Sequence, residues 1–235
     1  ATLAGLREYV VALHELLRGR PVDWHGKRIH TSWIQRPVPI YITAEGPKTL
    51  ELAGEIADGV VMHTGTTPEI ISESIALVHR GAERSGRDPD SVDIWAMLKG
   101  NVADTREAAI DEIRMGLAGS AHHAFRFGLE GKYVPDHLRA PVLELVRRYD
   151  TGHHEVWDGA NAGLSDELGI TDYLADRFGL VGTPDECVAR LESLRDAGLR
   201  QVIIPALGPN PLAVLRRFGT EVFPRLRSIS GVSGG

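Results

Sequence analysis

The stretch 38–67, VPIYITAEGPKTLELAGEIADGVVMHTGTT, constrains the fold of this chain more than any other part of the sequence. The uncharged, β-branched run 38–43 predicts a buried strand, and 60–62 predicts a second one. Pro47 suits the first position of a helix, because proline has no N–H to leave unbonded there. Apolar residues then recur at helical spacing. The stretch therefore predicts two parallel strands joined by a helix, with a second helix opening after Thr67.

Each of these predicted strands leads through a short loop into the N-terminus of a helix. The loops, 44–46 and 63–66, each contain a glycine, which lets the backbone approach a ligand closely. Helix N-termini present unbonded N–H groups and the positive end of the helix dipole, and this combination suits a phosphate. Glycine and threonine also serve ordinary turns and helix caps, and their spacing alone does not separate the two interpretations.

The rest of the chain continues the alternation of helices and strands. Apolar residues at helical spacing predict an amphipathic helix over 3–17, whereas the connector 20–36 has no periodicity. Capping, proline and periodicity signals predict helices at 68–84, from 104 to about 117, at 135–149, at 165–178, from Pro184 to Gly198 and from Pro211, and strands at 92–102 and 201–207. Four strands alternating with helices predict an α/β fold with a parallel sheet and right-handed crossovers.

Residues 119–178 interrupt this regular pattern. They lack a clean period and are rich in histidine, so we expect an insertion that serves as a lid or binding segment, or that is mobile. A metal hydrolase that uses the pairs at 122–123 and 153–154 is one alternative. Adjacent histidines point in different directions on a helix, however, and no carboxylate-bearing ligand motif accompanies them. No metal site is therefore expected. The Ser/Gly-rich end, 230–235, is expected to be frayed.

Composition excludes several classes of protein. A net charge of −6 without a basic cluster argues against nucleic acid as a partner. No apolar run approaches the ~20 residues that a membrane-spanning helix needs. The single cysteine, Cys187, excludes an internal disulfide and is expected to be a small buried or half-buried side chain in a helix. With no signal peptide recognised, a cytoplasmic location is expected.

The signature at 39–65 resembles the centre of the luciferase-like superfamily of flavin- and deazaflavin-dependent oxidoreductases. The resemblance consists of a strand ending in a short loop, then Gly46-Pro47, a helix through 52–54, and Ala-Asp-Gly at 57–59. The segment FGLVGTPDECVARLESLRDAGLRQVIIPAL, 178–207, also resembles this family. The resemblance covers the chain except for most of 119–165. It implies a (β/α)8 TIM-barrel fold of which roughly the C-terminal half is present, as one partial domain over 1–235 with the insertion at 119–178.

This resemblance implies hydride transfer between coenzyme F420, or reduced FMN, and a small organic substrate. The sequences Gly-Pro-Lys-Thr at 46–49 and Ala-Asp-Gly at 57–59 resemble those of the F420-using reductases more closely than those of luciferase proper. An FMN-dependent monooxygenase that uses oxygen is an alternative, as is a non-catalytic half-barrel that pairs with another chain. A homodimer is expected, because relatives often dimerise. No catalytic residue is assigned, because the family's ring-facing residues come mostly from the first strands, which this chain is expected to lack.

The resemblance also implies a set of cofactor-binding positions in the two loops and the turns that follow them. They are Ala44, Glu45, Gly46, Lys48, Thr49, His63, Thr64, Gly65 and Thr66. Thr66 stands where the sugar-phosphate-using members carry a lysine, which argues against a phosphorylated sugar as substrate. An acid beside a phosphate is unfavourable unless its carboxylate turns away, so Glu45 is expected to contact the cofactor through its backbone.

Overall fold

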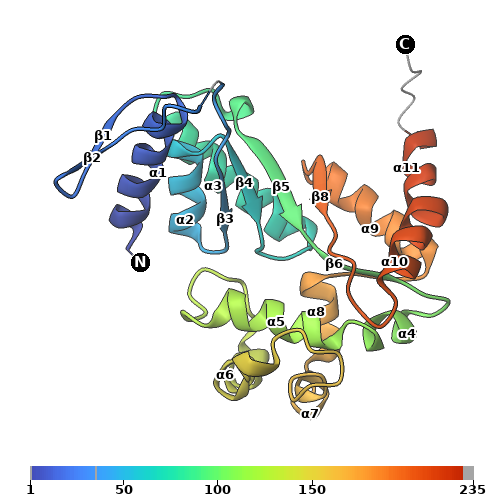
Figure 1. Cartoon of the computed structure of the whole chain (residues 1–235). Helices are drawn as coiled ribbons and strands as arrows, with labels where there is room; N and C mark the ends of the chain where they lie inside the picture. Colours follow the sequence, from blue (N-terminus) through green and yellow to red (C-terminus); the bar gives the residue numbers. More distant parts are fainter. Residues whose placement is uncertain (1, 35, 230–235) are drawn as a thin grey trace. The chain divides into compact units, whose positions relative to one another are not determined.

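The computed structural model describes residues 2–34 and 36–229, so the frayed end expected at 230–235 lies outside the described residues. The chain divides into two compact units, which are described separately below. The first consists of Ala1–Met62 and Glu73–Trp95, and the second of His63–Ser72 and Ala96–Gly235. Both combine strands with helices (Figure 1), and the prediction of an α/β fold with parallel strands is confirmed.

The first unit contains the strand–helix–strand arrangement predicted from the sequence. Strand β3 (Tyr41–Ala44) pairs in parallel with β4 (Gly59–Met62), and β5 (Asp93–Met97) lies next to β4. Helix α2 (Pro47–Ile56) joins β3 to β4 and packs on both strands (Figure 1). Strand β4 is largely buried, as predicted, but β3 alternates exposed and buried residues, so the prediction of a buried strand over 38–43 is wrong. One face of β3 is covered and the other is exposed.

Two glycines bring the helices of this unit together. Helix α3 (Pro68–Arg84) passes α2 so closely that a Cβ on Gly54 would lie 2.0 Å from the Val78 carbonyl oxygen. A Cβ on Gly81 would likewise lie 1.9 Å from the carbonyl oxygen of Glu51, so larger residues would force the helices apart. Helix α1 (Leu3–Leu17) has the bounds that the periodicity predicts, and it packs on α2.

The connector between α1 and β3 contains a hairpin that the sequence analysis did not predict. Strands β1 (Val22–Trp24) and β2 (Lys27–Ile29) are antiparallel, and the two residues between them, His25 and Gly26, both have positive φ angles. This pair of left-handed residues is the conformation that tight hairpin turns require. The strands are too short to show a period, so only the turn residues carried a signal.

The second unit has its own parallel pair, β6 (Lys99–Val102) and β7 (Gly179–Gly182). The single strand predicted over 92–102 is divided at Leu98, whose N–H donates instead to Ile203 in β8 (Gln201–Ile203). Strand β7 was not predicted, because Gly-Leu-Val-Gly is short and carries no alternating pattern. Three helical segments follow these strands: α9 (Pro184–Asp196), α10 (Pro211–Arg217) and, beyond the π-helical turn Phe218–Val222, α11 (Phe223–Ile229).

The predicted insertion is a packed helical segment. It begins within α5 (Arg114–Phe125) and contains α6 (Arg139–Arg148), α7 (Leu164–Glu167) and α8 (Thr171–Phe178), with short 3₁₀ turns between some of them. The single helix predicted from 104 to about 117 is instead α4 (Arg106–Asp111) followed by the first turn of α5. Helix α5 is buried on almost every side, which explains why its sequence shows no amphipathic period. Its side chains share a core with α6 and α8, formed by residues such as Leu117, Phe125, Leu145, Leu174 and Phe178.

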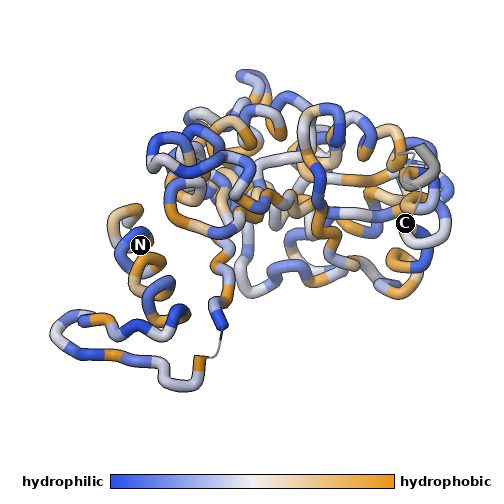
Figure 2. The backbone as a smooth tube through the Cα atoms, turned by 90° about the horizontal axis from the view of Figure 1, so that it is seen from above, coloured by the Kyte–Doolittle hydropathy of each residue, from blue (hydrophilic) through white to orange (hydrophobic). Residues whose placement is uncertain are grey.

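Hydrophilic and hydrophobic stretches follow one another along the backbone (Figure 2). Among residues 2–34 and 36–229, no helix combines the length and the apolar character that would let it cross a membrane.

Candidate functional site

The loop 63–66, one of the two predicted cofactor loops, belongs to the second unit and is buried along its whole length. Gly65 has a φ of +142°, a backbone conformation that other residues rarely adopt. A Cβ at this position would lie 2.7 Å from Nε of Arg177. Glycine is therefore required here both by the backbone conformation and by the close approach of a side chain.

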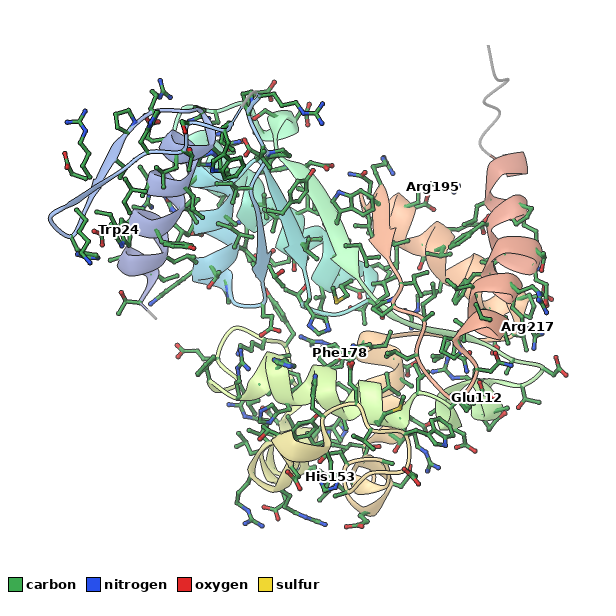
Figure 3. All side chains as sticks on the ribbon, viewed as in Figure 1. Trp24, Glu112, His153, Phe178, Arg195 and Arg217 are labelled. Atoms are coloured by element: carbon green, nitrogen blue, oxygen red, sulfur yellow. The ribbon has the colours of Figure 1, made fainter. Side chains whose placement is uncertain are left out.

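Arg177, at the end of α8, holds this loop in place. Its Nε and Nη2 atoms donate to the Thr64 carbonyl oxygen at 3.1 and 3.0 Å, and its Nη1 lies 3.4 Å from the Tyr133 carbonyl oxygen. The guanidinium lies 5.6 Å from the ring centres of both Phe125 and Phe178, and Phe178 is labelled in Figure 3. Burial lowers the pKa of Arg177. The sequence analysis missed this residue. The feature that could have identified it is a charged side chain among apolar residues at the end of a predicted helix.

Thr66 uses its polar groups within the protein. Its N–H donates to the Arg177 carbonyl oxygen at 2.6 Å. Its hydroxyl lies 3.2 to 3.3 Å from the carbonyl oxygens of Asp176, Arg177 and Gly179. Such carbonyls at a helix C-terminus have no partner within the helix. Thr66 therefore fastens the loop to the end of α8, and its backbone and side-chain donors are engaged there.

His63 connects the same loop to α5. Its Nε2 lies 3.2 Å from the Ser120 hydroxyl oxygen, and its ring centre lies 6.3 Å from that of Phe178. The loop is thus framed by α5 through Ser120 and by α8 through Arg177. Ser120 and Arg177 both lie in the segment predicted to be an insertion, 119–178, so that segment supports a predicted cofactor loop.

The other predicted loop, which follows β3, belongs to the first unit. Ala44 is buried, Glu45 and Gly46 are half-buried, and Lys48 is exposed at the start of α2. Gly46 is the residue before the helix, has an ordinary φ of −106°, and has no atom within 4 Å of the position of a Cβ. The first-turn amides of a helix lack partners within the helix, although that of Thr49 reaches the Gly46 carbonyl oxygen at 3.0 Å.

The two loops start from paired residues, because Ala44 at the end of β3 lies opposite Met62 at the end of β4. Beyond these residues the loops belong to different compact units. The structure therefore brings 44–49 together as one helix N-terminus and 63–66 together as one buried loop, each within its own unit.

The histidines of the insertion make contacts with neighbouring aromatic and acidic residues. His122 stacks on Tyr149 with ring centres 4.4 Å apart, and His123 meets His154 edge-on at 5.2 Å. His153 pairs with Asp150 through Nδ1 at 2.7 Å. Within the part of the chain that the structure describes, no three His, Cys, Asp or Glu side chains are grouped so that they could hold a metal ion.

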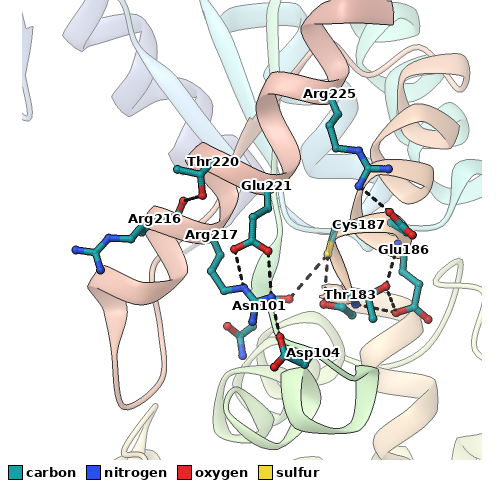
Figure 4. A network of polar contacts seen from close by, with 12 residues as sticks. Asn101, Asp104, Thr183, Glu186, Cys187, Arg216, Arg217, Thr220, Glu221 and Arg225 are labelled. Carbon is teal, nitrogen blue, oxygen red and sulfur yellow. Dashed lines mark hydrogen bonds and ion pairs between the residues drawn. The ribbon is translucent and has the colours of Figure 1, made fainter.

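Cys187 is buried in α9, as predicted, and its sulfur lies within 4.0 Å of the carbonyl oxygens of Asn101, Leu180 and Gly182 (Figure 4). Burial, with a smaller contribution from Glu186, raises the pKa of the Cys187 thiol to about 12. A thiol with such a pKa is not a nucleophile at neutral pH.

Comparison with known proteins gives a consistent set of relatives. Residues 1–201 match the family described as luciferase-like monooxygenase. The chain is 29% identical over 230 residues to 5,10-methylenetetrahydromethanopterin reductase of Methanolobus tindarius, covering 94% of this chain and 66% of that protein. It is 30% identical over 235 residues to F420-dependent glucose-6-phosphate dehydrogenase of Nakamurella multipartita, covering 97% of this chain and 61% of that protein.

Solved structures agree with these relatives. The coenzyme F420 dependent tetrahydromethanopterin reductase from Methanopyrus kandleri superimposes with a TM-score of 0.68 at 26% identity. The match covers 95% of this chain and 63% of that one. This chain thus spans between 61% and 66% of the length of these relatives. With residues 1–201 matching the family description, the chain belongs to the luciferase-like monooxygenase family.

Proposed function

We propose that this chain is the C-terminal part of a (β/α)8 barrel oxidoreductase that transfers hydride between coenzyme F420, or reduced FMN, and a small organic substrate. The observation that carries the proposal is the pair of strands β3 and β4, whose aligned ends each lead into a short loop and a helix. Ligands of such barrels bind at the C-terminal ends of the strands. The named relatives include two proteins described as F420-dependent.

In this proposal the residues after β3 hold the phosphate end of the cofactor. The open space beside Gly46 allows a phosphate to approach the backbone, and Pro47 places the N-terminus of α2 there without adding a donor that needs a partner. The helix dipole and the first-turn groups of Lys48 and Thr49 favour an anion. F420 or FMN, when bound, supplies the hydride chemistry, and the chain's own residues bind and orient it.

We propose a role in cofactor binding for the loop after β4 as well, which belongs to the second unit. His63, Thr64 and Gly65 are the positions proposed to approach the cofactor, and Gly65 allows the closest approach because it has no side chain. Thr66 anchors the loop on α8 through its N–H and hydroxyl. A neutral threonine committed to these carbonyl oxygens does not offer the cation that a sugar phosphate needs, so the proposed substrate is not a phosphorylated sugar.

An absorbance titration of the full-length protein with F420 and with FMN tests the choice of cofactor. Saturable binding of F420 that is tighter than that of FMN supports the reductase, and the reverse order supports an FMN-dependent monooxygenase. Binding of neither cofactor contradicts both and favours the non-catalytic partner subunit. Gel filtration with light scattering tests the proposed homodimer, and fractionation of the source cells tests the proposed cytoplasmic location.

A matched pair of variants tests the site itself. Gly46→Val adds a side chain where no atom lies within 4 Å, so the fold is expected to tolerate it while cofactor affinity falls at least about tenfold, on the order of 1.4 kcal/mol. Gly163→Val is the control, because Gly163 also precedes a helix, has a negative φ, and has no atom within 4 Å of its Cβ position. Equal cofactor binding by both variants would show that the phosphate does not sit beside Gly46.

A further inference from the structure

We propose that Lys99 is the anchor of a carboxylate-binding site in the second unit, and that Glu155 occupies this site when no ligand is bound. Lys99 begins β6, and its side chain is 7% exposed. Its Nζ lies 2.5 Å from Oε1 of Glu155, whose side chain is 27% exposed. The carboxylate is thus the outer member of the pair and lies on the side from which a ligand would come.

This ion pair differs from the others in the second unit. Arg217 pairs with Asp104 and Arg225 with Asp185, and those two carboxylates are 93% and 86% exposed (Figure 4). Such surface pairs need no further explanation, because water solvates both partners. A buried ammonium, in contrast, requires an anion beside it at all times. Lys99 therefore requires either Glu155 or an equivalent carboxylate.

Glu155 is held in this position by a strained and irregular segment. Its φ is +55°, the left-handed conformation that residues other than glycine seldom adopt. It lies in the segment 150–163, which contains one short 3₁₀ turn, Thr151–His153, and is otherwise turns and coil. Strain of this kind is found where a segment is held by a specific contact and can be released when the contact is replaced. Among the ion pairs of this segment, His153–Asp150 lies at the surface, whereas the pair with Lys99 holds a buried cation that an external carboxylate could bind in place of Glu155.

Lys99 and Tyr149 both approach one face of α5. Gly116 and Gly119 lie one turn apart on this helix. A Cβ on Gly116 would lie 3.6 Å from Cδ of Lys99, and one on Gly119 would lie 3.2 Å from the Tyr149 hydroxyl. Tyr149 and His154 are joined by a hydrogen bond of 2.6 Å between the hydroxyl and Nδ1. A bound carboxylate would therefore meet an ammonium, a phenol and an imidazole.

Tyr149 remains neutral in this environment. Burial, and then the negative charge of Glu155, raise the pKa of Tyr149 to about 12, so its hydroxyl keeps its proton at neutral pH. A phenol has one proton to donate. When Nδ1–H of His154 donates to the phenol oxygen, the Tyr149 hydroxyl can donate to a second oxygen of a carboxylate while the ammonium binds the first.

The same helix connects this site to the loop after β4. Ser120, which follows Gly119, contacts His63. Consecutive helical residues point about 100° apart, so the two contacts lie on adjacent faces of α5. That a carboxylate binds at Lys99 does not depend on the proposed oxidoreductase function. That this carboxylate belongs to the enzyme's substrate does depend on it. The ligand class is a small organic molecule that bears a carboxylate.

Trp157 lies in the segment 150–163 and reports on its position. The experiment is a titration of tryptophan fluorescence in the full-length protein with sodium acetate, with sodium phosphate as the competing anion and sodium chloride as the ionic-strength control. A change that is absent from Trp157→Phe comes from this segment. We expect Glu155→Gln to bind acetate at least tenfold more tightly than the unmodified protein, because the competing charge is removed.

Two further variants complete the test. The double variant Lys99→Met/Glu155→Gln removes both charges together, leaves no buried unpaired ion, and is expected to lose acetate binding. Glu155→Asp keeps the charge but shortens the side chain, and it is expected to bind acetate with intermediate affinity. It also provides the readout if Glu155→Gln does not fold.

The proposal is overturned if Glu155→Gln, or Glu155→Asp in its place, binds acetate no more tightly than the unmodified protein. It is also overturned if the double variant binds acetate as well as Glu155→Gln does. Phosphate binding stronger than acetate binding would show that the ligand is a phosphate and would contradict the carboxylate assignment. Because these titrations contain no F420 or FMN, their failure is distinguishable from failure of the cofactor proposal.

Discussion

The carbonyl oxygen of Thr64 accepts two hydrogen bonds from one guanidinium, that of Arg177, which lies 113 residues further along the chain. The two residues belong to a loop after a strand and to the end of a helix, and both are buried. A charged donor that reaches one carbonyl with two N–H groups fixes its position in two directions. The loop between β4 and α3, which we propose to face the cofactor, is thus held in place by a side chain from a different helix, α8.

Arg177→Lys is predicted to loosen this loop. A lysine keeps the charge but cannot reproduce the paired N–H geometry, and a buried ammonium with fewer partners is unfavourable. We expect the free energy of unfolding to fall by about 2 kcal/mol in urea denaturation. Arg190→Lys is the control, because Arg190 makes a longer contact of 3.7 Å with the exposed Asp176 carboxylate, and it should change stability by less than about 0.5 kcal/mol. Similar effects of the two substitutions would refute the role given to Arg177.

Gly65→Ala is predicted to be more damaging than Gly46→Ala, although both glycines lie in the proposed cofactor loops. At Gly65 the added Cβ meets Arg177 at 2.7 Å, and the φ of +142° is unfavourable for alanine. We expect a loss of about 2 kcal/mol or more, from overpacking and backbone strain together. At Gly46 neither penalty applies, so the change should be within about 0.5 kcal/mol. Chemical denaturation of both variants gives the comparison, and equal midpoints would contradict it.

Tyr149 is predicted to make stability fall at alkaline pH. Its pKa is raised by burial from 10.0 to about 12, so the folded state favours the protonated phenol. The resulting stability is complete below pH 10 and is lost as the pH rises towards 12. Over that range the unmodified protein should lose about 2 kcal/mol more than Tyr149→Phe, as measured by urea denaturation at several pH values.

Tyr133→Phe supplies the control for this pH dependence, because the Tyr133 side chain is exposed. It should keep the pH dependence of the unmodified protein. If Tyr149→Phe retains the full alkaline loss of stability, the buried phenol is not its source.

The thiol of Cys187 is predicted to be unreactive in the folded protein. It is buried, and its pKa is raised to about 12 by burial and then by the charge of Glu186. Labelling with a chromogenic disulfide reagent should therefore be slow in buffer and complete in denaturant, because only the exposed thiolate reacts readily. Rapid stoichiometric labelling of the folded protein would show that α9 opens in solution.

The local elements that were predicted from the sequence share one physical property: their signals lie within a few residues. The start of α2 at Pro47 and the capping box between Thr183 and Glu186 are formed by neighbours in the chain, and both are present. Helix α1 has the bounds predicted from its apolar spacing. Strand β7 and the part of α5 beyond residue 117 were missed because complete burial removes the alternation that makes such elements visible in a sequence.

The sequence by itself determined the alternation of parallel strands with helices, the caps that begin several of the helices, and the family signature at 39–65. It did so because backbone propensity, capping and turn geometry act over a few residues. Only the tertiary structure decided that Arg177 holds the loop of Gly65, that Thr66 is committed to α8, and that Lys99 meets Glu155. These contacts join residues 56 to 113 positions apart, and no local pattern encodes which distant partner a buried polar group finds.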